Sequence, residues 1–356
     1  MFKDSPYSVR LASVLVSIYL VMLGLYYLQD LLILIAFALI LAMVLLPLCR
    51  GLENKGFPRS VAISICLLFS VAIIAGLISL LAFQIIEFSN DWPMFIKKAE
   101  KWISGLQTFL SRNLNISRKK QMLELSNQTI GLLKNSGSIL TATFSTIVHS
   151  LTILILIPIF MFFMLSYRSF FFTFLAMVFP TTEKDMLRGI MGKTGSVVQG
   201  YLVGLLFVMF TVACANSLGF WWIGVDYPIF FGITTGLLLL IPYIGIWIGA
   251  SLPILLSLAT LSPSHALAIV AWIAAVQFIE ANFITPLVIG SKVSINPLVA
   301  MLALLGGEML WGIPGLILAL PFTAIIKVIF DHVPTLQPYG FILGEAPKRV
   351  KETEAP

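Results

Sequence analysis

Long apolar runs fill most of the chain, and polar residues are confined to short breaks between them. The first two runs cover about residues 11–28 and 31–48 and are separated only by Gln29 and Asp30. A helix rises 1.5 Å per residue, so roughly 20 apolar residues cross the ~30 Å hydrocarbon layer of a bilayer. The pattern therefore predicts an antiparallel pair of membrane-spanning helices at the start of the chain.

Further runs have the length of a membrane span, at about residues 60–86, 142–166, 196–219 and 265–289. Segment 87–140 is different, because its apolar residues recur at steps of three and four opposite charged residues over about 92–110. This spacing predicts an amphipathic helix rather than a span, and a second helical stretch is expected around 119–135. We expect a surface helix at the lipid headgroups; the alternative is a helix that seals a contact between subunits.

Two apolar stretches in the C-terminal third, 229–260 and 297–327, are too long for one comfortable span. Glycine and proline interrupt both of them, at Pro242, Gly245, Gly249 and Pro253 in the first, and at Gly306, Gly307, Gly312, Pro314 and Gly315 in the second. Each stretch predicts two half-helices that meet in a broken centre. A loosely shared order of tryptophan, glycine and Leu-Pro indicates a weak internal repeat.

The amino-acid composition also indicates that most of the chain lies in a lipid bilayer. Hydrophobic residues make up 59% of the chain and charged residues 11%, whereas a soluble domain has roughly 25% charged residues. The first apolar run is longer than a signal-peptide core and lacks an A-x-A site, so we expect an uncleaved helix. The sequence predicts an all-α, polytopic integral membrane protein with about eight transmembrane segments, including two broken or re-entrant helical hairpins in the C-terminal half.

Positive charge gives the chain its expected orientation. The 22 Lys and Arg exceed the 16 Asp and Glu, and they lie in short loops such as the one with Arg50, Lys55 and Arg59. The positive-inside rule places that loop and both termini in the cytoplasm. The chain shows no basic stripe with interleaved aromatic residues, so we expect no nucleic-acid partner.

Catalytic and cofactor motifs are not recognisable. The sequence "GIMGKT" has Leu187 at the first glycine position of a phosphate-binding loop, and no H-E-x-x-H or spaced nucleophile, base and acid is present. The cysteines and histidines lack the spacing of metal ligands (Cys49, Cys66, Cys214, His149, His265 and His332). We therefore expect neither an enzyme nor a bound metal or cofactor.

A polar cluster interrupts the run at 265–289. Gln277 and Glu280 are three residues apart and share a helix face, while Pro286 cannot donate a hydrogen bond to the carbonyl of Asn282. An ionised acid at the bilayer centre costs on the order of 3 kcal/mol, so Glu280 needs a partner, a water-filled approach or a proton. Because paired interrupted helices point to a transport site, we predict that this cluster binds a solute or an ion. The alternative is a glutamate that only ties helices together.

Glu308 is a second acid at membrane depth, in the "GGEMLWG" sequence of the second interrupted stretch. Water could reach a broken hairpin tip. For this residue a structural role and a functional role both stay open.

Three blocks of the sequence resemble the signature blocks of the autoinducer-2 exporter family, also described as PerM-like permeases. They are "LLIPYIGIWIGASLP", "QFIEANFITPLVIG" and "NPLVAMLALLGGEMLWGIPGLILALPFTAIIK". The resemblance is specific over residues 195–330 and looser over the rest of the chain. It implies a bacterial inner-membrane transporter that exports autoinducer-2, a small polyhydroxylated signal, or that exchanges sodium for protons.

The positions that match the family blocks are Ile241, Pro242, Tyr243, Gly245, Gln277, Glu280, Asn282, Pro286, Gly290, Pro297, Gly306, Gly307, Gly312, Gly315 and Pro321. The chain departs from the blocks at Ile246, where proline is frequent, at Ala281, where glycine is frequent, and at Glu308, where a small or neutral residue is usual. The first two departures put the identity of the substrate in doubt. The third adds a group that could take up a proton.

These observations predict secondary transport driven by an ion gradient. The expected solute-binding or ion-binding residues are Glu280, Gln277, Asn282 and Glu308, and the expected gating or backbone positions are Pro242, Tyr243, Gly245, Gly249, Pro286, Gly290, Gly306, Gly307, Gly312 and Gly315. The partners implied are the lipid bilayer, a small polar solute or monovalent cation, and further copies of the chain. The rival hypotheses are a sodium/proton antiporter and a passive pore or scaffold.

We divide the chain accordingly into the parts that this hypothesis requires. They are three N-terminal spans (1–86), an extracytoplasmic amphipathic insertion (87–140), the fourth span with a cytoplasmic linker helix (141–194), a C-terminal transport core (195–330) and a cytoplasmic tail (331–356).

Overall fold

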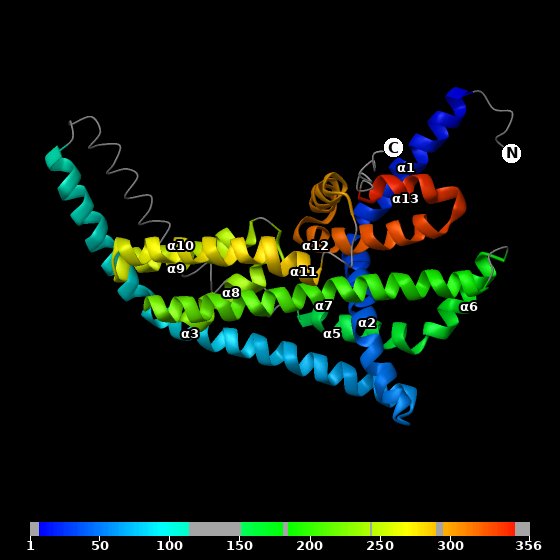
Figure 1. The fold of residues 1–356 in the computed structure, drawn as a ribbon, viewed down its shortest axis with the longest axis horizontal. Coiled ribbons are helices and arrows are strands. Elements are labelled where there is room, and N and C mark those ends of the chain that lie inside the picture. The colour runs from blue at the N-terminus through cyan, green and yellow to red at the C-terminus, as the bar shows by residue number, and fades with distance from the viewer. Residues whose placement is uncertain (1–6, 114–150, 181–183, 243, 290–294, 346–356) are drawn as a thin grey trace, which may run out of the picture. The chain divides into compact units, whose positions relative to one another are not determined.

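The described part of the chain folds into α-helices (Figure 1). The computed structural model describes residues 7–113, 151–180, 184–242, 244–289 and 295–345. Within those ranges the helices are α1 (Tyr7–Tyr27), α2 (Gln29–Asn54), α3 (Arg59–Asn113), α5 (Leu151–Ser166), α6 (Arg168–Val178), α7 (Lys184–Ile223), α8 (Pro228–Leu238), α9 (Gly245–Thr260), α10 (Pro263–Ile279), a π-helix (Glu280–Ile284), α11 (Thr285–Val288), α12 (Pro297–His332), a 3-10 turn (Pro334–Leu336) and α13 (Gln337–Leu343). The predicted all-α class is confirmed.

Most of the predicted spans correspond to long apolar helices. Of the span predicted at 142–166, residues 142–150 lie outside the described residues, and α5 covers the remainder. Among the described residues 6 helices are long and apolar enough to cross a membrane, or up to 7 if the bent pair of α5 and α6 is one span. They include α1, α2, the Arg59–Phe88 part of α3, and the continuous Pro263–Val288 segment. The prediction of a polytopic membrane protein is confirmed.

Helix α3 does not stop where its apolar part ends. It continues through Pro93 to Asn113, so the first amphipathic stretch predicted from the spacing is an extension of the third span. Phe88 and Phe95 on this extension are buried and stacked, with ring centroids 5.7 Å apart. The second expected stretch, 119–135, lies outside the described residues.

Helix α6 has 11 residues, which are too few to cross the bilayer. It bends by 64° from α5 and buries none of its residues within the chain. Its exposed face is apolar, with Phe170, Phe174 and Met177 each more than half exposed. The short length, the bend and the exposed apolar face indicate that α6 does not continue the membrane span of α5.

Two compact units alternate along the chain. The first unit contains Met1–Cys66, Ile155–Leu202 and Lys292–Pro356, and the second contains Leu67–Leu154 and Val203–Ser291. The division into five functional parts stays a prediction.

The first unit packs α12 against α1 and α2. Its core contains Ala36, Ile40, Val198 and Leu318, with Trp311 packed beside them. The indole Nε1 of Trp311 donates a hydrogen bond of 3.0 Å to the carbonyl oxygen of Leu25 near the end of α1.

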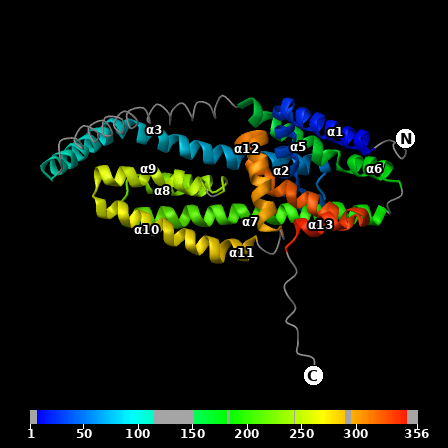
Figure 2. The ribbon, with the colours of Figure 1, turned by 90° about the horizontal axis from the view of Figure 1, so that it is seen from above.

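The core of the second unit is aromatic. Phe88, Phe220, Phe230 and Phe231 are each at most 4% exposed and pack with aliphatic residues of α9 and α10. Figure 2 shows α8 and α9 side by side, and α10 packs against α9. Five helices therefore contribute to this apolar interior, namely α3, α7, α8, α9 and α10.

Candidate functional site

The first predicted broken hairpin is formed by α8 and α9. Helix α8 ends at Leu238 and α9 begins at Gly245, and Pro242 lies between them. Gly245 lies against the end of α8, and a Cβ there would lie 1.6 Å from the carbonyl oxygen of Leu238. Gly249 packs on Thr235 of α8, with an ideal Cβ 2.8 Å from the Thr235 Cα. Tyr243 lies outside the described residues.

The second predicted broken hairpin lies within α12. Gly312 has φ 61° and ψ −140°, which interrupts the helix and separates it into two halves. Residues other than glycine rarely adopt a positive φ of this kind. Gly307 and Gly315 meet across the break, and Gly306 is exposed with nothing near its Cβ position. The prediction of two interrupted hairpins is confirmed.

A π-helical turn over Glu280–Ile284 interrupts the span between α10 and α11. Pro286 follows at the start of α11, and its ring lacks an N–H and crowds the carbonyl four residues before it. The backbone N–H of Thr285 bonds instead to the carbonyl of Glu280, five residues back. Single π-turns of this kind occur frequently at functional sites.

Glu280 is buried in this turn, with 7% of its surface exposed. Its Oε2 accepts a hydrogen bond of 2.6 Å from Nε2 of Gln277, and its Oε1 accepts a hydrogen bond from the Thr285 hydroxyl. In the described part of the chain, no Lys, Arg or His nitrogen forms an ion pair with Glu280. The carboxyl group is therefore held by neutral donors of its own helix.

Gln277 keeps one unused hydrogen-bonding atom beside the carboxyl group. Its Oε1 is buried and has no partner among the residues that the structure describes. The cluster thus offers oxygen atoms from a carboxylate, an amide and a hydroxyl. Oxygen groups of this kind suit hard cations as well as protons and solute hydroxyls.

Sequence reasoning missed Thr285. Residues five apart do not face each other on a regular α-helix, so the regular helical spacing does not predict a contact between Thr285 and Glu280. The wider π-turn brings position i+5 over position i. The available signal was Pro286, which disturbs the regular helix one turn after Glu280.

Asn282 does not join the cluster. Its side chain is exposed, and its Nδ2 donates a hydrogen bond of 2.8 Å to the carbonyl of Phe278. Pro286 is also exposed, and Gly290 lies outside the described residues. The structure therefore brings Gln277 and Glu280 together, as predicted from their spacing, and leaves Asn282 on the outer face of the same helix.

Apolar residues of α7 lie beside this part of the span. Val208 and Val212 of α7 pack with Val276 of α10, and Ile284 and Val288 join them. Gly204 lets α7 approach closely, since a Cβ there would lie 3.2 Å from Cγ1 of Val288. The polar cluster therefore sits on one helix with a mainly aliphatic neighbour.

Glu308 lies in the first half of α12, four residues before the break at Gly312. Its side chain is exposed in this chain. It belongs to the first unit, whereas Glu280 belongs to the second. Its role stays a prediction.

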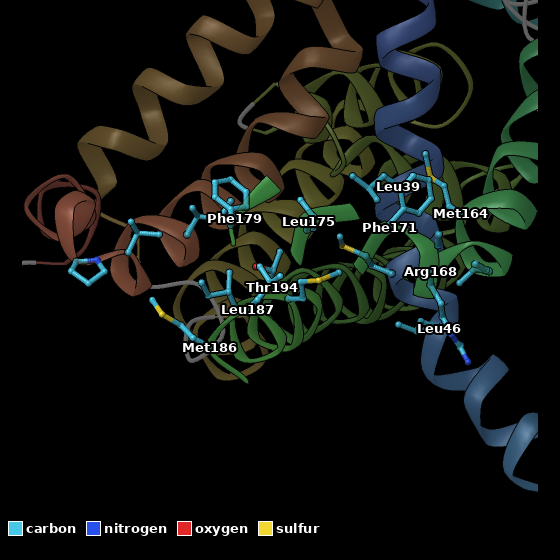
Figure 3. A pocket seen from close by; sticks show the side chains of 18 residues that line it. Leu39, Leu46, Met164, Arg168, Phe171, Leu175, Phe179, Met186, Leu187 and Thr194 are labelled. Atoms are coloured by element: carbon cyan, nitrogen blue, oxygen red, sulfur yellow. The ribbon is translucent and has the colours of Figure 1, made fainter. Parts of the chain in front are cut away.

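A large cavity in the first unit is chemically different from the Glu280 cluster (Figure 3). It has a volume of about 790 Å³ and is lined by leucine, methionine, phenylalanine and other apolar side chains, with Arg168 and Thr194 as its polar members. The guanidinium of Arg168 forms an ion pair with Glu53 at the end of α2. None of the described residues predicted as site residues lines this cavity.

Comparison with known proteins agrees with the transport function that the sequence predicts. The chain is 26% identical to the Bacillus subtilis protein YueF over 306 residues, covering 83% of this chain and 82% of that protein. It is 27% identical to YrrI of the same organism over 305 residues, covering 83% and 84%. It is 28% identical to MT0215 of Mycobacterium tuberculosis over 301 residues, covering 82% and 79%. All three are named as transport proteins.

The long apolar helices, the interrupted hairpins and the buried acid thus occur in a chain whose relatives are named for transport. The sequence model of the AI-2E family of transporters matches residues 15–335, which is most of the chain. The protein is a multi-pass membrane protein that belongs to the AI-2E transporter family.

Proposed function

We propose that this protein is a secondary transporter of the bacterial inner membrane that moves a small polar solute and couples the movement to protons through Glu280. The observation that carries the proposal is the environment of this one carboxyl group. It is buried, and both of its oxygens are bonded to neutral donors.

The neighbours of Glu280 suit both of its protonation states. A hydroxyl group can donate to an ionised carboxylate and can rotate to accept from a protonated one. The Gln277 amide can do the same by exchanging its Nε2 for its unpartnered Oε1. A proton could therefore arrive or leave without leaving a buried polar group unpaired.

The hydrogen bonds of Glu280 argue against a purely structural role. A glutamate that locks a helix bundle bonds to a second helix. Both recorded partners of Glu280, Gln277 and Thr285, belong to its own continuous span. The passive scaffold is therefore the weaker hypothesis.

The proposed solute is neutral and polyhydroxylated, and autoinducer-2 is one candidate of this class. Its hydroxyl groups would bond to Gln277 and to the free ends of the half-helices, as in other transporters with broken helices. Export would use the membrane potential or a proton gradient, and one charge moved across 100 mV supplies about 2.3 kcal/mol. In this proposal both termini are cytoplasmic and the chain forms a homo-oligomer.

A sodium/proton antiporter is the second candidate. Glu280, Thr285 and the unpartnered Oε1 of Gln277 supply oxygen atoms that could replace the water around a monovalent cation. In that case protonation of Glu280 would expel the cation, and no organic solute would be needed.

Proteoliposomes containing the purified protein test the proposal. We expect Glu280→Gln to abolish flux driven by a pH gradient while the variant remains folded and extractable in detergent. Glu280→Asp should retain part of the coupled flux, because it keeps the carboxyl group. The matched control is Glu87→Gln on α3, whose side chain is exposed.

Two results would contradict the proposal. Normal coupled flux in Glu280→Gln would exclude Glu280 as the coupling group. Unfolding of both Glu280 variants, with Glu87→Gln intact, would favour the scaffold. Sodium-triggered proton movement without any organic solute would favour the antiporter.

A further inference from the structure

Asn216 is a polar residue enclosed in the apolar interior of the second unit. Its side chain on α7 is 0% exposed, and neither Oδ1 nor Nδ2 has a hydrogen-bond partner among the described residues. Buried amides are almost always bonded, because an unpaired polar group loses its water without compensation. Asn216 therefore lacks both a donor and an acceptor that its surroundings should supply.

A second unpartnered group, the indole N–H of Trp272, packs against α7 about one turn further along that helix than Asn216. Nε1 of Trp272 on α10 is buried and has no partner within the described part of the chain. The indole packs on Gly219, where an ideal Cβ would lie 2.1 Å from this nitrogen. Gly219 is three residues after Asn216, and positions so spaced share a helix face with Cβ atoms roughly 5–6 Å apart.

The unpartnered atoms define the chemistry of the group that they would bind. Asn216 Nδ2 and Trp272 Nε1 are donors, and Asn216 Oδ1 is an acceptor. A cation would be repelled by two N–H groups, and an anion would leave the acceptor unused. A hydroxyl group fits, because its oxygen accepts from the donors and its hydrogen bonds to Oδ1.

The position of this pair connects it to Glu280. Helices α7 and α10–α11 pack in antiparallel register, since Gly219 lies against Trp272 and Gly204 lies against Val288. Trp272 precedes Gln277 by five residues, a rise of about 7 Å along the helix. Residues five apart lie on different sides of a regular α-helix, so a molecule bound at Trp272 reaches the unpartnered Oε1 of Gln277 by extending along and partly around α10.

We propose that Asn216 and Trp272 form a hydroxyl-binding subsite, which holds a hydroxyl group of the transported molecule while another part of that molecule reaches Gln277. The identity of the ligand rests on the proposed function. The same chemistry would hold a water molecule that hydrates the route to Glu280, and the experiment separates the two sources.

The test uses the full chain in proteoliposomes with ribitol, a neutral five-carbon polyol, as the probe. Radiolabelled ribitol uptake and proton uptake, followed with a trapped pH dye, are measured for the wild type, Asn216→Leu and Trp272→Phe. Asn216→Ser, which keeps a donor and an acceptor, is the conservative variant. Trp221→Phe is the matched control, because Trp221 is 71% exposed.

Folding is monitored by thermal unfolding in detergent. Asn216→Leu removes two unpaired polar atoms from an apolar interior, so we expect its melting temperature to equal or exceed that of the wild type. If this variant fails to fold, Trp272→Phe and Asn216→Ser provide the same comparison.

A rise of at least fivefold in the KM for ribitol in both Asn216→Leu and Trp272→Phe, with partial recovery in Asn216→Ser, supports a solute hydroxyl. An unchanged KM with proton uptake slowed at least fivefold supports a bound water. Folded variants that match the wild type within twofold in both measurements would overturn the subsite.

The same assay separates failure of the subsite from failure of the proposed function. If Glu280→Gln remains coupled while Asn216→Leu and Trp272→Phe raise the KM, the role of Glu280 is wrong and the subsite stands. If Glu280→Gln loses coupling while the other two variants match the wild type, the subsite is wrong and the role of Glu280 stands.

Discussion

Gly307 and Gly315 lie backbone against backbone across the break in α12. A Cβ on Gly307 would lie 2.5 Å from the carbonyl oxygen of Gly315, and a Cβ on Gly315 would lie 2.0 Å from that of Gly307. Real side chains do not approach a carbonyl so closely. The two halves of the helix are therefore held at a distance that only glycine permits, as in other membrane helices with small residues at their contact.

Gly315→Ala should destabilise the protein. The added methyl group cannot be accommodated without separating the two halves of α12, and overpacking of this kind typically costs about 1–3 kcal/mol. Gly306→Ala is the matched control, because nothing lies within 4 Å of its Cβ position. Thermal unfolding in detergent should show a lower melting temperature for Gly315→Ala only; equal values for the two variants would contradict the contact.

Thr285→Val should weaken proton-coupled flux by about tenfold. Valine has nearly the shape of threonine but cannot donate to Oε1 of Glu280, and a hydrogen bond to a charged group contributes about 1.5–3 kcal/mol. Thr285→Ser keeps the hydroxyl and should retain most of the flux. The measurement is pH-driven uptake in proteoliposomes, and equal uptake by both variants would show that the hydroxyl has no role.

Pro286→Ala should impair the same flux by restoring a regular helix around Glu280. Alanine supplies the missing N–H and removes the ring that crowds the carbonyl of Asn282. Thr285 would then no longer lie over Glu280.

A double-mutant cycle checks this mechanism. If Pro286 acts through Thr285, the loss of flux in the Pro286→Ala/Thr285→Val double variant should equal the loss in Thr285→Val alone. Additive losses would mean that the proline acts by another route.

Arg168→Met should destabilise the first unit, because it leaves Glu53 without its ion-pair partner. The two side chains are only 27% and 19% exposed. We expect a loss of roughly 2 kcal/mol, below the 3–5 kcal/mol of a fully buried pair. The double variant Arg168→Met/Glu53→Gln should recover part of this loss in thermal unfolding; a larger loss in the double variant would contradict the pairing.

Much of the fold follows from the length and spacing of apolar residues. The spans at 11–28 and 31–48 were predictable because Gln29 and Asp30 are the polar interruption between two runs that each match the bilayer thickness. The breaks were predictable because glycine and proline are concentrated at 242–249 and 306–315. A lone proline was a poorer guide, since α3 continues through Pro93 and α9 through Pro253.

The details of the site depended on information that spacing does not contain. Gly306 and Gly307 are identical residues in the sequence, yet only Gly307 meets another backbone. The contact of Thr285 with Glu280 requires a π-turn, which the regular helical period cannot represent.

Asn216 illustrates the same limit. A single amide within the run at 196–219 has the appearance of a tolerated core residue. Whether such a residue has partners depends on which side chains α8 and α10 bring beside it, and this is decided by the packing of distant segments.

The hydrogen bond between Trp311 and Leu25 gives the break in α12 a mechanical connection to the beginning of the chain. Trp311 immediately precedes Gly312, so a swing of the first half of α12 about that glycine pulls on α1 through the indole N–H. A spin label on α1 would register such a swing without any modification of the hairpin. A bulky protein fused to the N-terminus would resist the movement of α1 and so would oppose the swing.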